Sequence, residues 1–315
     1  MAIPALSRRT LLRGTGLAGL GVVLAACGGG ETDPGTTAPG GTDLPVDGGD
    51  VSSAALEAAG VADGENVLTP IVATFEVLTG PTGRVQFGLL DAENTPLLDA
   101  EVQVWIVGGE GTEVVAGPLE PIFYGEGLGT RGVYVLEPAL ETAGLLDLVV
   151  ATDGGARVGT AALRVIAPEE SAVVRPGQEF PSFATPTTAD PMGLEELCTR
   201  TPPCGMHELS LDEALAMGKP VVLTVSTPKY CQTAVCGPVV DVVLAAKEAR
   251  ADQEVLFIHA EVFTDAGNTP TDYVAEDLAL PTEPWTWVIG ADGVVTDRFD
   301  GPVVAPLLEQ ALDAL

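Results

Sequence analysis

A continuous apolar run near the end of the chain, Val221–Val225, constrains the fold most. Consecutive apolar residues of this kind are buried on both faces, as in a central strand whose sheet is covered on both sides. The capping box from Ser210 to Glu213 predicts a short helix over 211–217 just before this strand. Tyr230-Cys231 follows the strand, and a helical apolar pattern covers 233–251. This part of the chain therefore predicts an α/β domain.

The remaining segments complete the order of elements in this domain. We expect a strand over 255–262, a short helix near 272–278, strands over 285–289 and 294–299 with a turn at Asp292-Gly293, and a final helix over 303–314. The predicted order is β-α-β-α-β-β-α.

Residues 205–315 resemble the thioredoxin superfamily. The resemblance depends on the aromatic-cysteine pair Tyr230-Cys231 at the start of a helix, on Pro238 within that helix, and on Pro284 immediately before a strand, where the family has a cis-proline. It implies that Cys231 is the nucleophile, that Cys236 is the resolving thiol, and that the Pro284 loop packs against the sulfurs.

General physical chemistry supports a nucleophilic Cys231 at the start of a helix, because a helix N-terminus stabilises a thiolate. We expect Tyr230 and Trp285 to contact the substrate. Two departures stand out: four residues separate Cys231 from Cys236 instead of two, and the family's buried acid aligns with Val225.

The N-terminus indicates export and anchoring. Ser7-Arg8-Arg9-Thr10-Leu11-Leu12 resembles a twin-arginine signal, and Leu24-Ala25-Ala26-Cys27 resembles a bacterial lipobox. Residues 1–26 are therefore predicted to be a signal peptide, with lipid attached to Cys27. The expected location is extracytoplasmic, with the lipid bilayer as one partner through Cys27. Residues 27–64 are rich in Gly, Thr, Asp and Pro and are predicted to be a disordered tether.

Four further cysteines, Cys198, Cys204, Cys231 and Cys236, would lie in an oxidising compartment, where an even number indicates disulfides. Three pairings are possible. Proximity in sequence favours Cys231 with Cys236 and a structural disulfide between Cys198 and Cys204.

Residues 65–167 are predicted to be an all-β sandwich that weakly resembles immunoglobulin-like modules, followed by a linker over 168–192 and the thioredoxin-like domain over 193–315. The expected strands of the sandwich are Ile71–Leu78, Arg84–Leu90, Glu101–Val107, Gly132–Glu137, Leu145–Ala151 and Arg157–Ile166. The sandwich segment contains no His, Met or Cys, so it offers no soft metal ligands.

The net charge of −31, from 14 basic and 45 acidic residues, excludes nucleic acid as a partner. It also indicates a salt-tolerant source, with thermal stability that rises from low to molar salt.

The favoured function is thiol–disulfide oxidoreduction through Cys231 and Cys236, with exported protein thiols and disulfides or a membrane redox partner as substrates. No metal and no cofactor are expected. One alternative is a non-catalytic binding or assembly protein of the same fold with structural disulfides. A copper chaperone would use two cysteines with a histidine, and the chain has only His207 and His259. A peroxiredoxin-like function conflicts with Thr224 and Pro228, which stand where that signature needs Pro and Thr.

Overall fold

The computed structural model describes residues 53–81, 83–109, 111–126, 131–231 and 235–315. The predicted signal peptide, Cys27 and most of the predicted tether lie outside these ranges. Within them, no helix combines the length and the apolar character that crossing a bilayer requires.

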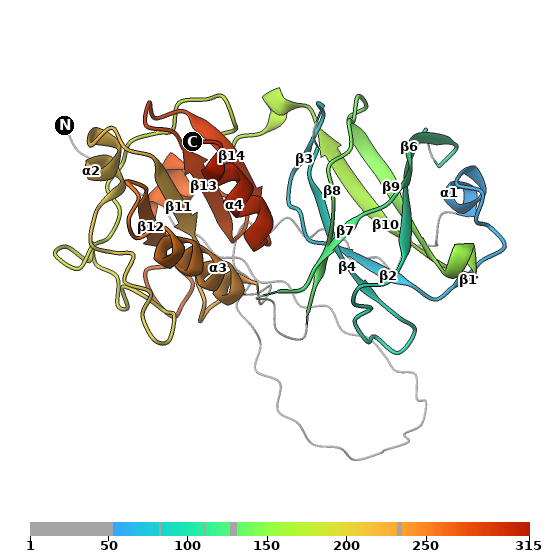
Figure 1. Cartoon of the computed structure of the whole chain (residues 1–315), viewed down its shortest axis with the longest axis horizontal. Helices are drawn as coiled ribbons and strands as arrows, with labels where there is room; N and C mark the ends of the chain where they lie inside the picture. The colour runs from blue at the N-terminus through green and yellow to red at the C-terminus, as the bar shows by residue number, and fades with distance from the viewer. Residues whose placement is uncertain (1–52, 82, 110, 127–130, 232–234) are drawn as a thin grey trace, which may run out of the picture. The chain divides into compact units, whose positions relative to one another are not determined.

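Two sheets form the first domain (Figure 1). In one sheet the strand order is β1-β10-β9-β5-β6, and β3 also pairs with β10. Its strands are β1 (Glu65–Asn66), β3 (Val77–Leu78), β5 (Val102–Gly108), β6 (Glu113–Leu119), β9 (Gly144–Thr152) and β10 (Arg157–Ile166). The other sheet, ordered β2-β4-β8-β7, consists of β2 (Thr69–Val72), β4 (Val85–Leu90), β7 (Ile122–Tyr124) and β8 (Val133–Leu136).

Both sheets contribute to one apolar core, so the domain is a β-sandwich. Phe87 on β4, Ile106 on β5 and Leu148 on β9 are fully buried in it. The expected strand over 71–78 is split between β2 and β3, which join different sheets. Strand β6 was not predicted; it contains Gly117-Pro118, residues that are unfavourable in a strand interior.

The predicted tether extends too far, because residues 53–64 belong to the first domain. Helix α1 (Ser53–Ala58) buries Ala55 and Leu56 against Trp105 and Val149 of the β1-containing sheet. This helix is too short for its apolar pattern to differ from that of a flexible Ala-rich segment.

The second domain contains a four-stranded sheet ordered β12-β11-β13-β14. Strands β11 (Val221–Val225) and β12 (Leu256–Ala260) are parallel, whereas β13 (Trp285–Ile289) is antiparallel to β11 and to β14 (Val295–Asp300). The central position of β11 confirms the prediction from its apolar run. With α2 (Leu211–Ala216), α3 (Cys236–Ala249), the single-turn π-helix η3 (Tyr273–Asp277) and α4 (Ala305–Asp313), the order of elements matches the prediction.

Helices cover one face of this sheet. Val239 and Val243 of α3 and Leu308 of α4 pack against Val222 and Val288. The opposite face packs against α2, η3 and an extended segment that precedes them in the chain. The predicted capping box at Ser210 is present and starts α2.

That extended segment was predicted to be a linker over the surface, but part of it is buried. Phe180 packs edge-on against Trp287, and Phe183 stacks on Tyr273. The backbone N–H of Phe180 donates to Gly293 O at 2.9 Å. Val173, Phe180 and Phe183 are therefore part of the core of the second domain, which the Pro- and Thr-rich composition of this segment concealed.

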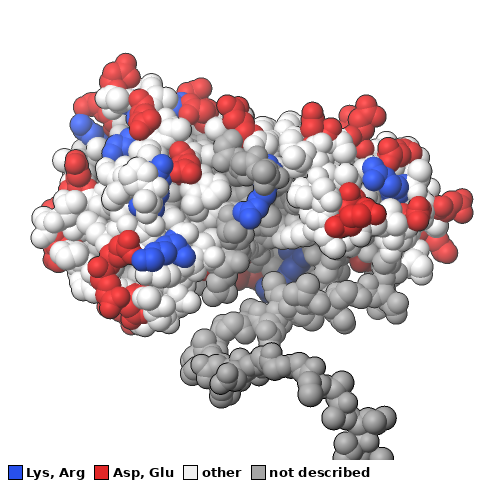
Figure 2. Space-filling view, turned by 90° about the horizontal axis from the view of Figure 1, so that it is seen from below, with Lys and Arg blue, Asp and Glu red and all other residues white. Residues whose placement is uncertain are grey.

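Acidic side chains are spread over the face seen in Figure 2. Several of the few basic side chains form ion pairs, such as Lys219 with Glu254 at 2.8 Å and Arg200 with Asp241 at 2.7 Å. The charge of these cations is thus offset locally, and the net charge of the chain remains strongly negative.

Candidate functional site

A disulfide between Cys231 and Cys236 lies where β11 leads into α3, with the two Cα atoms 5.9 Å apart. Helix α3 begins at Cys236, later than the predicted start at 233. Pro238 therefore lies in the first turn, where a missing N–H breaks no helical hydrogen bond. It does not kink the helix interior.

The two sulfurs differ in environment. Cys236 is fully buried, whereas Cys231 is partly exposed. The backbone N–H of Cys236 donates to Sγ of Cys231 at 3.3 Å. Cys231 is thus the sulfur that an incoming substrate can reach, and it lies at the positive end of a helix.

Pro284 follows a cis peptide bond from Glu283, as the family resemblance predicts. Sequence reasoning missed Glu283 itself. Its side chain is buried, and a carboxylate oxygen lies within 4.8 Å of both Cys231 and Cys236 sulfurs. A buried carboxylate from the loop before β13 thus lies beside the disulfide.

The two residues predicted to contact the substrate differ in exposure. Tyr230 is half-buried beside Cys231, and the Lys229 ammonium lies 5.3 Å from the centre of its ring. Trp285 has no exposed surface, and its indole N–H donates to Thr282 O at 2.8 Å. The predicted contact of Trp285 with substrate is wrong, because the side chain belongs to the core.

An open hollow lies near the start of α3. Its lining includes Lys229, just before Tyr230, and Gly237, just after Cys236. Thr199 and Asp241 also line it. Neither Cys231 nor Cys236 is among the residues that line it.

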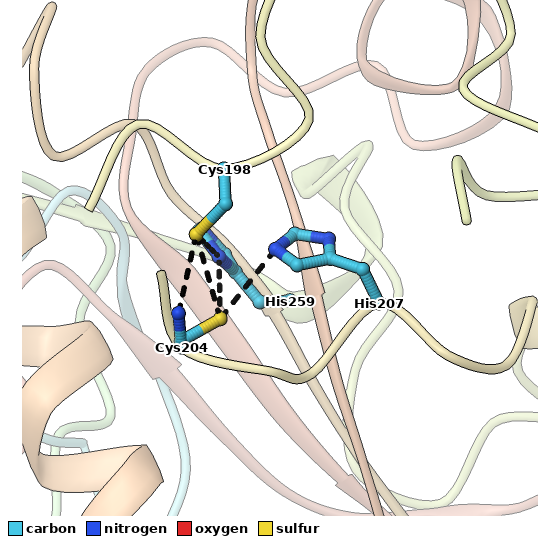
Figure 3. Close-up of side chains that lie close together, drawn as sticks. All are labelled: Cys198, Cys204, His207 and His259. Atoms are coloured by element: carbon cyan, nitrogen blue, oxygen red, sulfur yellow. Dashed lines mark hydrogen bonds between the residues drawn. The ribbon is translucent and has the colours of Figure 1, made fainter. Parts of the chain in front are cut away.

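A second group of cysteines lies on the α3 side of the sheet (Figure 3). Cys198 and Cys204 are free thiols with sulfurs 3.6 Å apart, so the disulfide predicted between them is not formed in this structure. The rings of His207 and His259 turn toward these sulfurs. We call these four residues the Cys₂His₂ cluster.

Hydrogen bonding within the cluster shifts the pKa values of the two thiols in opposite directions. The interaction with Cys204 holds the pKa of Cys198 far below its usual range, and the same interaction, with burial, raises the pKa of Cys204. Burial lowers the pKa of His207. Burial also opposes a charge on His259, but its interactions with Cys198 and Glu261 outweigh burial and raise its pKa.

The sequence contained a signal for this cluster. His207 follows Cys204 by three residues, a spacing typical of metal-ligand pairs. His259 lies 52 positions after His207 on β12, and only the fold brings it to the sulfurs.

Comparisons with known proteins give distant structural neighbours. No family model matches the chain, and no curated protein matches it in sequence. A thiol:disulfide interchange protein of the thioredoxin family from Chlorobium tepidum TLS is 15% identical, with a TM-score of 0.33, covering 45% of this chain and 97% of its own. A DsbF homologue from Corynebacterium diphtheriae is 19% identical, with a TM-score of 0.28, covering 36% of this chain and 80% of its own.

The immunoglobulin domains of a titin M10–obscurin-like 1 complex are 16% identical over 32% of this chain and 93% of their own, with a TM-score of 0.20. Similarity this distant assigns no family. The chemistry has to be inferred from the residues of the site.

Proposed function

We propose that the second domain is a thioredoxin-like thiol–disulfide oxidoreductase that acts on exported protein thiols and disulfides. The observation that carries this proposal is the Cys231–Cys236 disulfide at the start of α3, beside the cis peptide of Pro284. One sulfur is accessible and the other is buried, which is the asymmetry that a two-step exchange requires.

In the reducing direction, the Cys231 thiolate attacks one sulfur of a substrate disulfide. A Cys231–substrate bond forms, and the other substrate sulfur leaves as a thiolate. The Cys236 thiolate then attacks Cys231, which closes the disulfide and releases the second substrate thiolate. Oxidation of a substrate dithiol runs through the same steps in reverse.

Cys236 must lose its proton before it attacks, and it is buried away from water. The Glu283 carboxylate is close enough to accept that proton, directly or through one water. We assign Glu283 as the proton acceptor for Cys236.

A fluorescent mixed-disulfide substrate tests this function. The wild-type chain should turn over the substrate, whereas Cys231→Ser should show no exchange. Cys236→Ser should accumulate a covalent adduct on Cys231, detectable by mass spectrometry. Turnover that persists in Cys231→Ser would refute the proposal, and a disulfide that serves only structure would show no turnover in any form.

The N-terminal motifs complete the proposal. Lipid at Cys27 would hold the domains outside the cytoplasm, and the sandwich would serve as an immunoglobulin-like spacer or interaction module. Mass spectrometry of the mature N-terminus should find a diacylglycerol-bearing Cys27, and Cys27→Ala should release the chain from membranes.

A further inference from the structure

The four donor atoms of the Cys₂His₂ cluster have the spacing of a tetrahedral metal site. Bonds of about 2.3 Å from zinc to sulfur and about 2.0–2.1 Å to nitrogen place tetrahedral ligands about 3.8 Å apart for two sulfurs and about 3.5 Å apart for sulfur and nitrogen. Here the sulfurs of Cys198 and Cys204 are 3.6 Å apart. Sγ of Cys204 lies 3.5 Å from Nε2 of His207 and 3.4 Å from Nδ1 of His259.

The ligands lie in a closed environment. Cys204, His207 and His259 are 5%, 3% and 0% exposed, and all four donor atoms lie within 4.8 Å of one another. Cys198, Cys204 and the neighbouring Met206 pack into the apolar core beneath α3 and α4. Two thiols and two imidazoles sharing such a pocket have few alternatives: a disulfide, a shared proton or a metal.

Surrounding groups orient His259 toward the sulfurs. Nε2 of its ring lies 3.1 Å from the carbonyl oxygen of Ser226 and 3.8 Å from a carboxylate oxygen of Glu261. A proton on Nε2 is donated to the Ser226 carbonyl, with the Glu261 carboxylate nearby, and leaves the Nδ1 lone pair directed at Cys198 and Cys204. Glu261 is in turn fixed by the N–H and hydroxyl of Thr199. Carboxylate and carbonyl partners of this kind accompany histidine ligands of metals.

We propose that Cys198, Cys204, His207 and His259 bind a structural Zn²⁺ ion with four protein ligands. Two thiolates and two neutral imidazoles offset the charge of the ion, and tetrahedral S₂N₂ coordination is the geometry that zinc takes at closed sites. No water position is left open, so the ion has a structural role. The site is separate from the Cys231–Cys236 pair and does not depend on its redox activity.

The position of the site explains what the metal would stabilise. It would hold the loop over 198–207 against the edge strand β12, where the N–H of His259 also donates to Met206 O at 2.9 Å. Thr199 and Ser226, which contact Glu261 and His259 beside the site, also contact the segment around the disulfide. The Lys229 N–H donates to the Thr199 hydroxyl, and the Ser226 hydroxyl donates to Cys236 O. Zinc would therefore hold the backbone on both sides of the disulfide in place.

Metal analysis of the full chain tests the site. The purified protein, reconstituted with Zn²⁺ alone after chelation under reducing conditions, should hold one zinc per chain. Cys204→Ser and His207→Asn should each lose most of it. Cys231→Ser should keep one zinc, because Cys231, Cys236 and Glu283 form a different group of ligands.

A second measurement does not depend on whether the variants fold. In the wild-type chain, Cys198 and Cys204 should resist a thiol reagent while zinc is bound and react once a chelator has removed it. X-ray absorption at the zinc edge should show two sulfur and two nitrogen ligands. A Cys198–Cys204 disulfide that persists under these reducing conditions, or equal zinc content in His207→Asn, would each overturn the proposal.

Discussion

The backbone N–H of Cys236 donates a hydrogen bond to Sγ of Cys231 across 3.3 Å. This N–H belongs to the first turn of α3, where no carbonyl of the helix can accept it. Hydrogen bonds to a charged acceptor are about twice as strong as neutral ones. The interaction therefore strengthens when Cys231 becomes a thiolate, so the start of the helix favours the reduced, reactive form.

In the reduced protein, Cys231 should be alkylated by iodoacetamide at pH 7 on the order of tenfold faster than Cys236, or more. The physical reason is its exposure together with the N–H that stabilises its thiolate. Peptide mass spectrometry over a time course measures both rates. Equal rates at the two positions would contradict the assignment of Cys231 as nucleophile.

Replacing Glu283 by Gln should slow the closing of the Cys231–Cys236 disulfide by about a hundredfold at neutral pH, because Cys236 loses its proton acceptor. Stopped-flow measurement of the second exchange step reports this rate. Glu283→Asp should recover part of it.

Glu276→Gln is the matched control, since Glu276 is an exposed acid on η3. It should leave the rate unchanged. If the rate of Glu283→Gln matches that of the control, Glu283 does not accept the proton of Cys236.

Phe180→Ala should lower the free energy of unfolding by about 3 kcal/mol, because it removes a buried ring that packs against Trp287. Urea unfolding of the full chain, followed by tryptophan fluorescence, measures the change. The exposed neighbour Glu179 provides the control, and Glu179→Ala should change stability by less than about 0.5 kcal/mol. Similar values for both variants would show that this segment is loose in solution.

The buried carboxyl of Asp300 should make stability depend on pH. Burial raises the pKa of Asp300 to about 6, although the Arg298 guanidinium acts in the opposite direction. The unfolded value is about 3.9, so the folded state binds this proton more tightly, and the stabilisation is complete below about pH 4 and lost as the pH rises through 6.

The side chain of Asp300→Asn stays neutral, so from pH 4 to pH 7 the free energy of unfolding of the variant should rise by about 3 kcal/mol relative to that of wild type. Urea unfolding at both pH values measures the difference. Asp252→Asn, at an exposed position, should show no such trend. A flat difference for Asp300→Asn would mean that the carboxylate is solvated.

Local patterns were sufficient to predict the elements that carry the Cys231–Cys236 pair. Val221–Val225 needed burial on both faces, and the structure places it in the centre of the sheet. The strand at Trp285 was also found from its local pattern, and the cis bond before Pro284 was expected from the family resemblance.

Features that depend on distant contacts were missed. Glu283 reaches the sulfurs only because its loop folds back beside α3, and His259 meets Cys204 only through the register of β12. The helix over 53–58 has little apolar pattern of its own and is defined by the sheet that it covers.

The buried segment around Phe180 and Phe183 sets where the second folding unit begins. Any transfer of this domain to another chain, by recombination in evolution or by gene fusion in the laboratory, would have to carry the residues from about 171 onward. A cut at 193 would strip the aromatic cover from Trp287 and Tyr273 and leave a fragment with exposed apolar surface that tends to aggregate.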